Sequence, residues 1–192
     1  MIAPTLDAFG AARELAHVLE SNGVEYAIGG ALALGVWSDP RGTLDVDINL
    51  FVAQDRAAQV LDVLATAGVL FDRASALRAV ESGDSVLGRY HGLRVDLFMP
   101  SIPFSWEAGR TRRLVRGPDG ELAFLSPEAL AVFKLLFFRA KDVVDLEKLV
   151  TVQGTDLDTS YVRRWVADMM GEGDERVRTW DRIVAAHGAG RG

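Results

Sequence analysis

Hydrophobic residues change their spacing along the first part of the chain, and the changes separate helices from strands. Apolar residues recur every three or four positions over residues 6–21, which predicts an amphipathic helix that Asn22 and Gly23 end. Residues 24–28 predict a short buried strand, and residues 31–37 predict a short helix that starts at a glycine pair. The chain is therefore expected to begin with a helix, a strand and a second helix.

The next pattern is a strict alternation over residues 43–51, which predicts a strand with two chemically different faces. One face carries Leu44, Val46, Ile48 and Leu50, and the other carries Asp45, Asp47 and Asn49. A helix is expected over residues 55–67, with Asp55 as its N-cap and Gly68 as its stop.

Strand patterns dominate the chain as far as residue 125. They cover residues 77–80, 85–90, 93–99, 110–116 and 121–125, the first two being the weaker patterns. Pro100 and Pro103 break the third strand, and Gly117-Pro118-Asp119-Gly120 is a turn signal between the last two.

The pattern after residue 125 is helical. Ser126 and Pro127 are typical of a helix start, and helices are predicted as far as about residue 139 and then over residues 143–151, 159–170 and 174–187. The tail 188–192 is expected to be disordered. We therefore predict an α/β (α+β) fold: a core over residues 1–125 with a small mixed sheet and flanking helices, then a C-terminal helical region over residues 126–187 packed on the core.

Composition narrows the function classes. The 192 residues suit one domain or a domain with a helical extension, and there is no cysteine, which excludes disulfides, thiolate zinc sites and cysteine nucleophiles. The first residues lack the pattern of a signal peptide and no apolar run is long enough to span a membrane, so a cytoplasmic protein is expected. The net charge of −6 means that any contact with RNA needs a local basic patch.

Asp45 and Asp47 are the first candidates for chemistry. Residues two apart on a strand share a face, with Cα atoms about 6 to 7 Å apart. Two carboxylates this close repel each other unless a cation lies between them, and carboxylates with open positions suit Mg²⁺, which takes its remaining ligands from substrate phosphates. The alternative is an exposed edge strand with ordinary solvated aspartates.

Two further features could complete such a site. Gly29 and Gly30 stand between a strand and a helix, where glycine lets the backbone approach an anion closely; the alternative is a tight turn. Asp96 lies within an apolar strand, where aspartate is depleted. If the two strands pair, Asp96 joins Asp45 and Asp47 as a metal ligand or a general base; the alternative is an ion pair with Arg89 or Arg94.

Lys134 is the only charged residue in a stretch of helix from 129 to 138, so it needs a partner, for which a triphosphate or the acidic cluster would serve. The alternative is a lysine whose stem packs on the core. Asp142 and Asp145 follow at three-residue spacing from Arg139 and are better explained as an ion-pair cluster that joins two helices. Arg139 fits either a phosphate or this cluster.

The loop before the aspartates and two basic runs are weaker candidates. Arg41 and Thr43 precede the two aspartates, and Arg41 could hold phosphate oxygens; the alternative is a solvated loop. The runs Arg110, Arg112, Arg113 and Arg116, and Arg163 with Arg164, favour a solvated surface over RNA contact. The histidines His17, His91 and His187 have no metal-ligand spacing.

Taken together, these residues resemble the nucleotidyltransferase superfamily typified by DNA polymerase β, and within it the AbiEii-like and MenT-like nucleotidyltransferase toxins. The carriers are Gly29-Gly30, the stretch 41–48 around the two aspartates, Val95-Asp96-Leu97, and Ser126-Pro127-Glu128 leading to Lys134, Arg139 and residues 141–145. The glycine-to-aspartate gap is longer than the commonest spacing of the superfamily.

The resemblance implies a nucleotidyltransferase fold and an enzyme that moves a nucleoside monophosphate from ATP, GTP or CTP to an acceptor. It implies that Asp45, Asp47 and Asp96 bind two Mg²⁺ ions, with Mn²⁺ as a substitute. Lys134 is expected near the triphosphate and in catalysis, and Gly29, Gly30, Arg41, Thr43 and Arg139 are the other expected nucleotide-binding residues.

The acceptor separates three hypotheses. The first is a toxin of a toxin–antitoxin pair that modifies RNA, at a tRNA 3′ end, and that has a cognate antitoxin. The second is an enzyme that nucleotidylates a small hydroxylated molecule such as an antibiotic, which the acidic charge favours. The third is a non-catalytic nucleotide- or partner-binding protein on the same scaffold.

Overall fold

The computed structural model describes residues 6–117 and 120–187. The predicted disordered tail 188–192, the first five residues and positions 118 and 119 of the predicted turn lie outside the described residues. The chain divides into two compact units, Met1–Leu32 with Gly42–Phe124, and Ala33–Arg41 with Leu125–Gly192.

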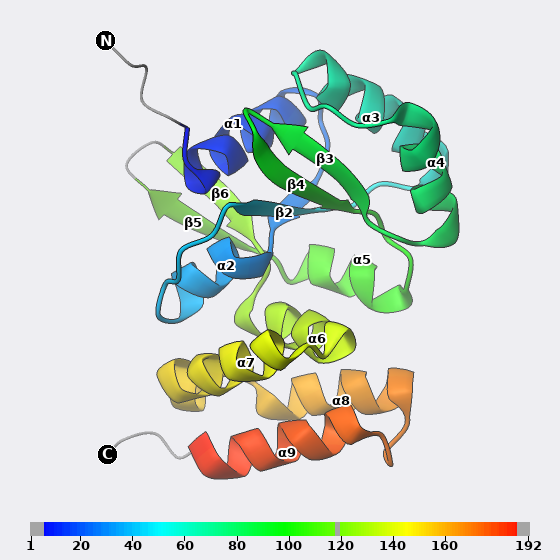
Figure 1. Ribbon diagram of the computed structural model, residues 1–192. Coiled ribbons are helices and arrows are strands. Elements are labelled where there is room, and N and C mark those ends of the chain that lie inside the picture. Colours follow the sequence, from blue (N-terminus) through cyan, green and yellow to red (C-terminus); the bar gives the residue numbers. More distant parts are fainter. Residues whose placement is uncertain (1–5, 118–119, 188–192) are drawn as a thin grey trace. The chain divides into compact units, whose positions relative to one another are not determined.

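The first unit holds all the strands that the structure describes (Figure 1). Its elements are α1 (Ala8–Ser21), β1 (Tyr26–Ile28), β2 (Asp45–Leu50), η1 (Gln54–Arg56), α3 (Ala57–Thr66), α4 (Arg73–Ser82), β3 (Val86–Tyr90), β4 (Leu93–Phe98), α5 (Pro103–Arg110), β5 (Arg113–Gly117) and β6 (Gly120–Phe124). Helix α2 (Gly30–Trp37) begins in this unit and ends in the other.

Within the described residues the strands form one six-stranded sheet in the order β3-β4-β2-β1-β6-β5. The pairs β2–β4 and β1–β6 are parallel, and the pairs β1–β2, β3–β4 and β5–β6 are antiparallel. The sheet is therefore mixed, with helices beside it, and the predicted fold class is confirmed.

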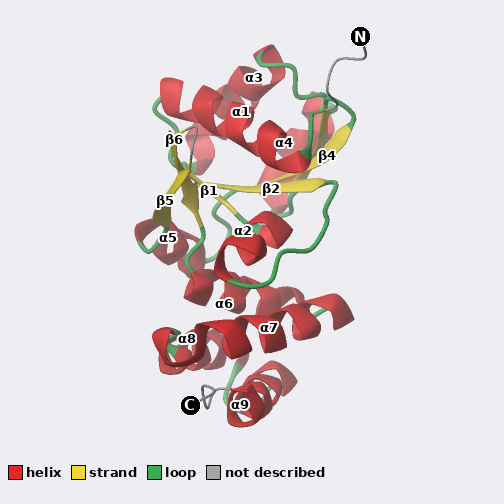
Figure 2. Ribbon diagram, turned by 90° about the vertical axis from the view of Figure 1, so that its left-hand side faces the viewer, coloured by secondary structure: helices red, strands yellow, loops and turns green. Residues whose placement is uncertain are grey.

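Successive side chains of β2 point to opposite faces of the sheet, and the two faces differ in chemistry. Val46 and Ile48 are fully buried on the face that α1 covers. Phe51 follows on the other face, where its ring lies against Gly109 of α5 so closely that an added Cβ would be 2.8 Å from it. Figures 1 and 2 show α1 and α3 on one face of the sheet and α5 on the other. The odd-numbered residues of β2, including both aspartates, therefore share the face of α5.

The second unit is built from α6 (Pro127–Phe137), α7 (Ala140–Gln153), η2 (Gly154–Asp156), α8 (Thr159–Met170) and α9 (Glu175–His187). The predicted start of α6 is confirmed, because the Ser126 side chain accepts a hydrogen bond from the Ala129 N–H at 3.1 Å. Trp180 is 1% exposed and anchors α9 in the helical core. No helix in the described ranges has the length and apolar character needed to cross a membrane.

Residues 33–41 are separated in sequence from the rest of the second unit but are tied to it by hydrogen bonds. The Trp37 indole Nε1 donates to the Leu125 carbonyl at 2.7 Å, and the Gln153 amide donates to the Trp37 carbonyl. Arg41 bonds to Asp145 of α7. The end of α2 and the following loop therefore belong to the helical unit.

Two predictions about local structure were wrong, and one helix was not predicted. The expected strand 77–80 lies in helix α4, because Asp72 caps the Ser75 N–H and Ala76 and Val80 bury one helical face. Asp55 is not an N-cap, since it lies inside η1 and α3 begins two residues later. Helix α5 was not predicted; Pro103 stands at its first turn, where proline is tolerated.

Candidate active site

The glycine pair and Asp47 are fixed against each other. The Gly29 N–H donates to the Asp47 carbonyl at 2.9 Å. Gly30 has φ +55°, and a Cβ at this position would lie 1.8 Å from Oδ2 of Asp47. Any other residue would therefore displace the carboxylate and strain the backbone, and glycine is required where α2 begins.

The strand register brings the three predicted carboxylates to one face of the sheet. In the parallel pair β2–β4, Asp47 is the partner of Asp96, and Asp45 is the partner of Arg94. Partners in neighbouring strands point to the same face, so Asp96 lies beside Asp47 as expected if the strands pair. All three carboxylates belong to the first unit and lie on the neighbouring strands β2 and β4.

Arg94 supplies a positive charge to this carboxylate face. Its Nε donates to Oδ1 of Asp96 at 2.8 Å, so the ion pair considered as the alternative explanation for Asp96 is present. This hydrogen bond and the Asp96 charge raise the pKa of Arg94, and Asp45 and Asp47 add to the effect. Within the described residues, Oδ2 of Asp96 accepts no hydrogen bond, so one oxygen of this carboxylate remains for a ligand.

The donor set fits Mg²⁺ held partly by substrate. In the described part of the chain, no three Asp, Glu or His side chains are arranged as a ready-made metal cage. Mg²⁺ is usually bound through one or two carboxylates plus phosphates and water, so the oxygen donors of Asp45, Asp47 and Asp96 suit it without such a cage.

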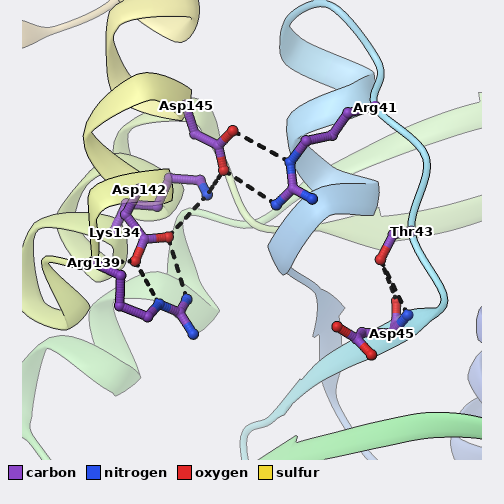
Figure 3. Close-up of polar contacts among 7 residues, drawn as sticks. All are labelled: Arg41, Thr43, Asp45, Lys134, Arg139, Asp142 and Asp145. Atoms are coloured by element: carbon purple, nitrogen blue, oxygen red, sulfur yellow. Dashed lines mark hydrogen bonds and ion pairs between the residues drawn. The ribbon is translucent and has the colours of Figure 1, made fainter.

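Thr43 organises the loop that leads into β2. Its hydroxyl accepts from the Asp45 N–H at 3.1 Å, as Figure 3 shows. The threonine therefore caps the start of the strand that carries the two aspartates. Its predicted contact with nucleotide stays a prediction.

In the second unit, Lys134 finds its partner in α7. The lysine is 5% exposed, and its Nζ donates to Asp145 at 2.6 Å and to Asp142 at 3.5 Å. Both carboxylates are almost fully buried, at 1% and 3% exposure of their side chains. The expected ion-pair cluster between two helices is therefore present.

Two arginines complete this cluster (Figure 3). Arg139 caps α7 and donates to Asp142 at 2.6 and 3.2 Å, and Arg41 donates to Asp145 through two bonds of 3.3 Å. Burial alone would raise the pKa of Asp142, but the hydrogen bond from Arg139 and the charges of Lys134 and Arg139 outweigh it and lower the pKa from 3.8. Three cations face two carboxylates, and the roles of Arg41, Lys134 and Arg139 toward nucleotide stay predictions.

The basic run after α5 is largely neutralised. Arg110 pairs with Glu107, Arg112 with Glu25, and Arg116 with Glu121. The Arg112 guanidinium also lies over the Phe51 ring, 5.9 Å from its centre. These contacts favour the structural explanation of the run over contact with RNA.

Comparison with known proteins identifies the architecture. Neither a protein-family model nor a curated protein matches the sequence. Among solved structures, a candidate nucleotidyltransferase from Thermotoga maritima is 16% identical to this chain, with a TM-score of 0.52. The match covers 77% of this chain and 94% of the Thermotoga maritima chain. A candidate nucleotidyltransferase from H. pylori is 12% identical, with a TM-score of 0.51. The match covers 98% of this chain and 93% of the H. pylori chain. The chain has a nucleotidyltransferase fold. At this level of identity the similarity shows the fold and not the reaction.

Sequence reasoning missed one part of the site on this nucleotidyltransferase fold. Arg94 was considered only as a neutralising partner of Asp96, yet its charge is felt by all three carboxylates. The signal was available, because Arg94 precedes Asp96 by two residues and so shares its face of the strand.

Proposed function

We propose that the protein is a magnesium-dependent nucleotidyltransferase that moves a nucleoside monophosphate from an NTP to a hydroxyl group and releases pyrophosphate. The observation that supports this proposal is the Asp47–Asp96 pair across two parallel strands, with Asp45 on the same face. Gly30 lets the Asp47 carboxylate approach the start of α2. The fold of the described chain is compatible with this chemistry.

Asp45 and Asp47 would hold the cations, which are two Mg²⁺ ions or Mn²⁺ in their place. Asp96 would add the oxygen that is not bonded to Arg94 as a further ligand. When bound, the ions neutralise charge on the triphosphate and on the leaving pyrophosphate. Asp96 accepts the proton of the acceptor hydroxyl; the acceptor oxygen then bonds to the α-phosphorus, and the bond from that phosphorus to the pyrophosphate oxygen breaks. The hydrogen bond from Arg94 Nε to Oδ1 orients the Asp96 carboxylate for this role.

The test is transfer of label from an α-labelled NTP to total RNA or to a panel of small hydroxylated molecules, with Mg²⁺. Wild type should transfer label, and Asp47→Asn should show no transfer because a cation ligand is lost. Asp168→Asn, the same chemical change on exposed Asp168 of α8, is the matched control and should behave as wild type. Equal transfer by wild type and Asp47→Asn would contradict the proposal.

Within this function, we take RNA as the acceptor, at a tRNA 3′ end, and the protein as the toxin of a toxin–antitoxin pair. The support is the sequence motif from Lys134 to Asp145, which resembles that of AbiEii-like and MenT-like toxins. Expression should then stop growth of the host, and Asp47→Asn should not. Label in tRNA that disappears when the 3′ hydroxyl is blocked would support this acceptor, and label in no RNA would exclude it.

A small hydroxylated molecule such as an antibiotic is the second candidate acceptor. The net charge of −6 favours a cationic molecule over RNA at long range. Resistance of a sensitive host that expresses wild type, absent with Asp47→Asn, would establish this activity.

The Arg94–Asp96 ion pair supports a third possibility, a non-catalytic nucleotide-binding protein, since it ties up part of the carboxylate site. Titration calorimetry separates this possibility from the enzymes: Mg²⁺-dependent NTP binding without transfer to any acceptor would favour it.

A further inference from the structure

The carboxylate face of the sheet continues beyond Asp96 onto the edge strand β3. In the antiparallel pair β3–β4, Leu87 is the partner of Asp96, and Arg89 is the partner of Arg94. Directly opposed residues point to the same face, so Leu87 and Arg89 lie on the same side as the carboxylates. The other side of β3 packs inward, where Tyr90 donates to Glu14 of α1.

This part of the face is open to solvent and combines apolar with cationic groups. Leu87 is 58% exposed, and Leu70, which forms a β-bridge with Arg89, is 72% exposed. Arg89 is exposed, and the side chain of Arg94 is 54% exposed. We refer to Leu70, Leu87, Arg89 and Arg94 as the acceptor strip.

The charges of the acceptor strip suit an anionic ligand. Like charges that lie directly opposite in a sheet destabilise it, and Arg89 and Arg94 are such a pair. Arg94 is neutralised by Asp96, whereas the Arg89 guanidinium donates to the Gly92 carbonyl at 3.3 Å and, among the described residues, to no carboxylate. A phosphate beside Arg89 would offset the repulsion between the two arginines. Its oxygens would also accept hydrogen bonds from the Arg89 guanidinium.

We propose that the acceptor strip binds the end of a single-stranded nucleic acid, with a phosphodiester at Arg89 and the terminal nucleoside against Leu87. This inference rests on the proposed nucleotidyl transfer to RNA and identifies the surface that holds the acceptor. Leu87 is the cross-strand partner of Asp96, so a terminal nucleoside held there presents its hydroxyl to the carboxylate that accepts the proton. A cationic small molecule would meet two arginines on this side of the site. Arg89 supplies a positive charge that no carboxylate among the described residues neutralises, and contact of an acidic chain with RNA needs such local charge.

Direct binding tests the acceptor strip without relying on catalysis. Fluorescence anisotropy would measure the affinity of a short, labelled single-stranded RNA for wild type, Arg89→Gln and Leu87→Ser over a range of salt concentrations. Arg89→Gln should weaken binding on the order of tenfold and reduce the slope of log affinity against log salt by about 0.7, the value of one phosphate contact to a single strand. Leu87→Ser should weaken binding with the salt slope unchanged.

Arg78→Gln is the matched control, because it makes the same charge change at an exposed arginine of α4 that is not part of the strip. Wild-type affinity in this variant supports the proposal. No binding of RNA by wild type, equal affinities for Arg89→Gln and Arg78→Gln, or tighter binding of a cationic aminoglycoside would overturn it. Failure of the proposed function is a separate result, the absence of Mg²⁺-dependent NTP binding in calorimetry.

Discussion

Gly30 is the residue at which backbone conformation and candidate chemistry depend on each other most directly. Its positive φ starts α2, and its missing side chain makes room for the Asp47 carboxylate. A glycine pair after a short strand could be recognised in the sequence, as could aspartates on one face of the next strand. The contact between them could not, because it depends on how β1 and β2 pair.

Gly30→Ala should therefore lower the free energy of unfolding by at least about 1 to 3 kcal/mol, the cost of placing a side chain at this φ, with further loss from the contact with Asp47. Urea denaturation would measure the change. Gly42→Ala is the control, since a Cβ there meets nothing within 4 Å, and it should be near neutral. A Gly30→Ala protein as stable as wild type would show that the close approach to Asp47 is not fixed.

Arg94 shows where prediction at the residue scale stops. The position of Asp96 beside Asp45 and Asp47 could be predicted once the two strands were assumed to pair. Side chains alternate along a strand, so the sequence decides which face of the sheet each residue occupies. Which of Arg89 and Arg94 pairs with Asp96 could not be derived, since it depends on side-chain conformations. That Lys134 needs a partner was predicted from its apolar surroundings, with a triphosphate or the acidic cluster as the expected partner. Its pairing with Asp142 and Asp145 of α7 was not predicted.

At the scale of elements, α6 and α7 are joined by ionic contacts inside the helical unit. Lys134 reaches two carboxylates across the helix pair. Lys134→Met should destabilise the protein by about 3 to 5 kcal/mol, because Asp142 and Asp145 would stay buried with less compensating charge. Lys148→Met on the exposed side of α7 is the control and should change stability by no more than about 0.5 kcal/mol. Similar unfolding midpoints in urea for the two variants would count against the ionic explanation.

The same cluster predicts how stability depends on pH. The folded-state pKa of Asp142 lies below its ordinary value of 3.8, so its contribution is fully present above about pH 5 and is lost as the pH falls through the folded-state pKa. The free energy of unfolding should therefore fall on acidification below about pH 4. Urea denaturation at several pH values would follow this decrease, and Asp142→Asn should make it shallower. If the free energy of unfolding of Asp142→Asn falls as steeply below about pH 4 as that of wild type, other carboxylates cause the decrease.

Helices and strands with a regular spacing of apolar residues were predictable from the sequence. Elements whose identity depends on the residues that cap them were less predictable. The strands β2 and β4 and the helices α1, α6, α8 and α9 follow clear alternation or helical spacing. Helix α4 was taken for a strand because its apolar residues are few, and its identity is set by the Asp72 cap and the left-handed Gly83 at its end. The six-strand order could not be derived, since parallel pairing of β1 with β6 joins residues far apart in sequence.

At the scale of the whole molecule, the chain passes between its two units at residues 32–33, 41–42 and 124–125. The sequence pattern predicted a single division, near residue 125. The first two passages were not visible in the sequence, because residues 33–41 read as an ordinary short helix and loop. Hydrogen bonds to Leu125, Asp145 and Gln153 tie them to the rest of the second unit.

Trp37→Phe tests the contribution of that segment. Loss of the indole hydrogen bond to the Leu125 carbonyl should reduce the free energy of unfolding by about 1 to 3 kcal/mol, as circular dichroism in urea would show. Trp106→Phe is the control, because Trp106 is 43% exposed on α5 and should tolerate the change. An equal effect of both substitutions would mean that residues 33–41 add little to the second unit.

Residues 33–41 also impose an order of events on the nascent chain. Their hydrogen-bond partners follow 88 to 116 residues later in the sequence. At about 5 to 20 residues per second, a ribosome needs on the order of 10 s to deliver those partners. During that interval Ala33 and Leu34, which are fully buried in the finished protein, have no helical unit to enter. The end of α2 must therefore wait for the last third of the protein to be synthesised before its apolar residues can be buried.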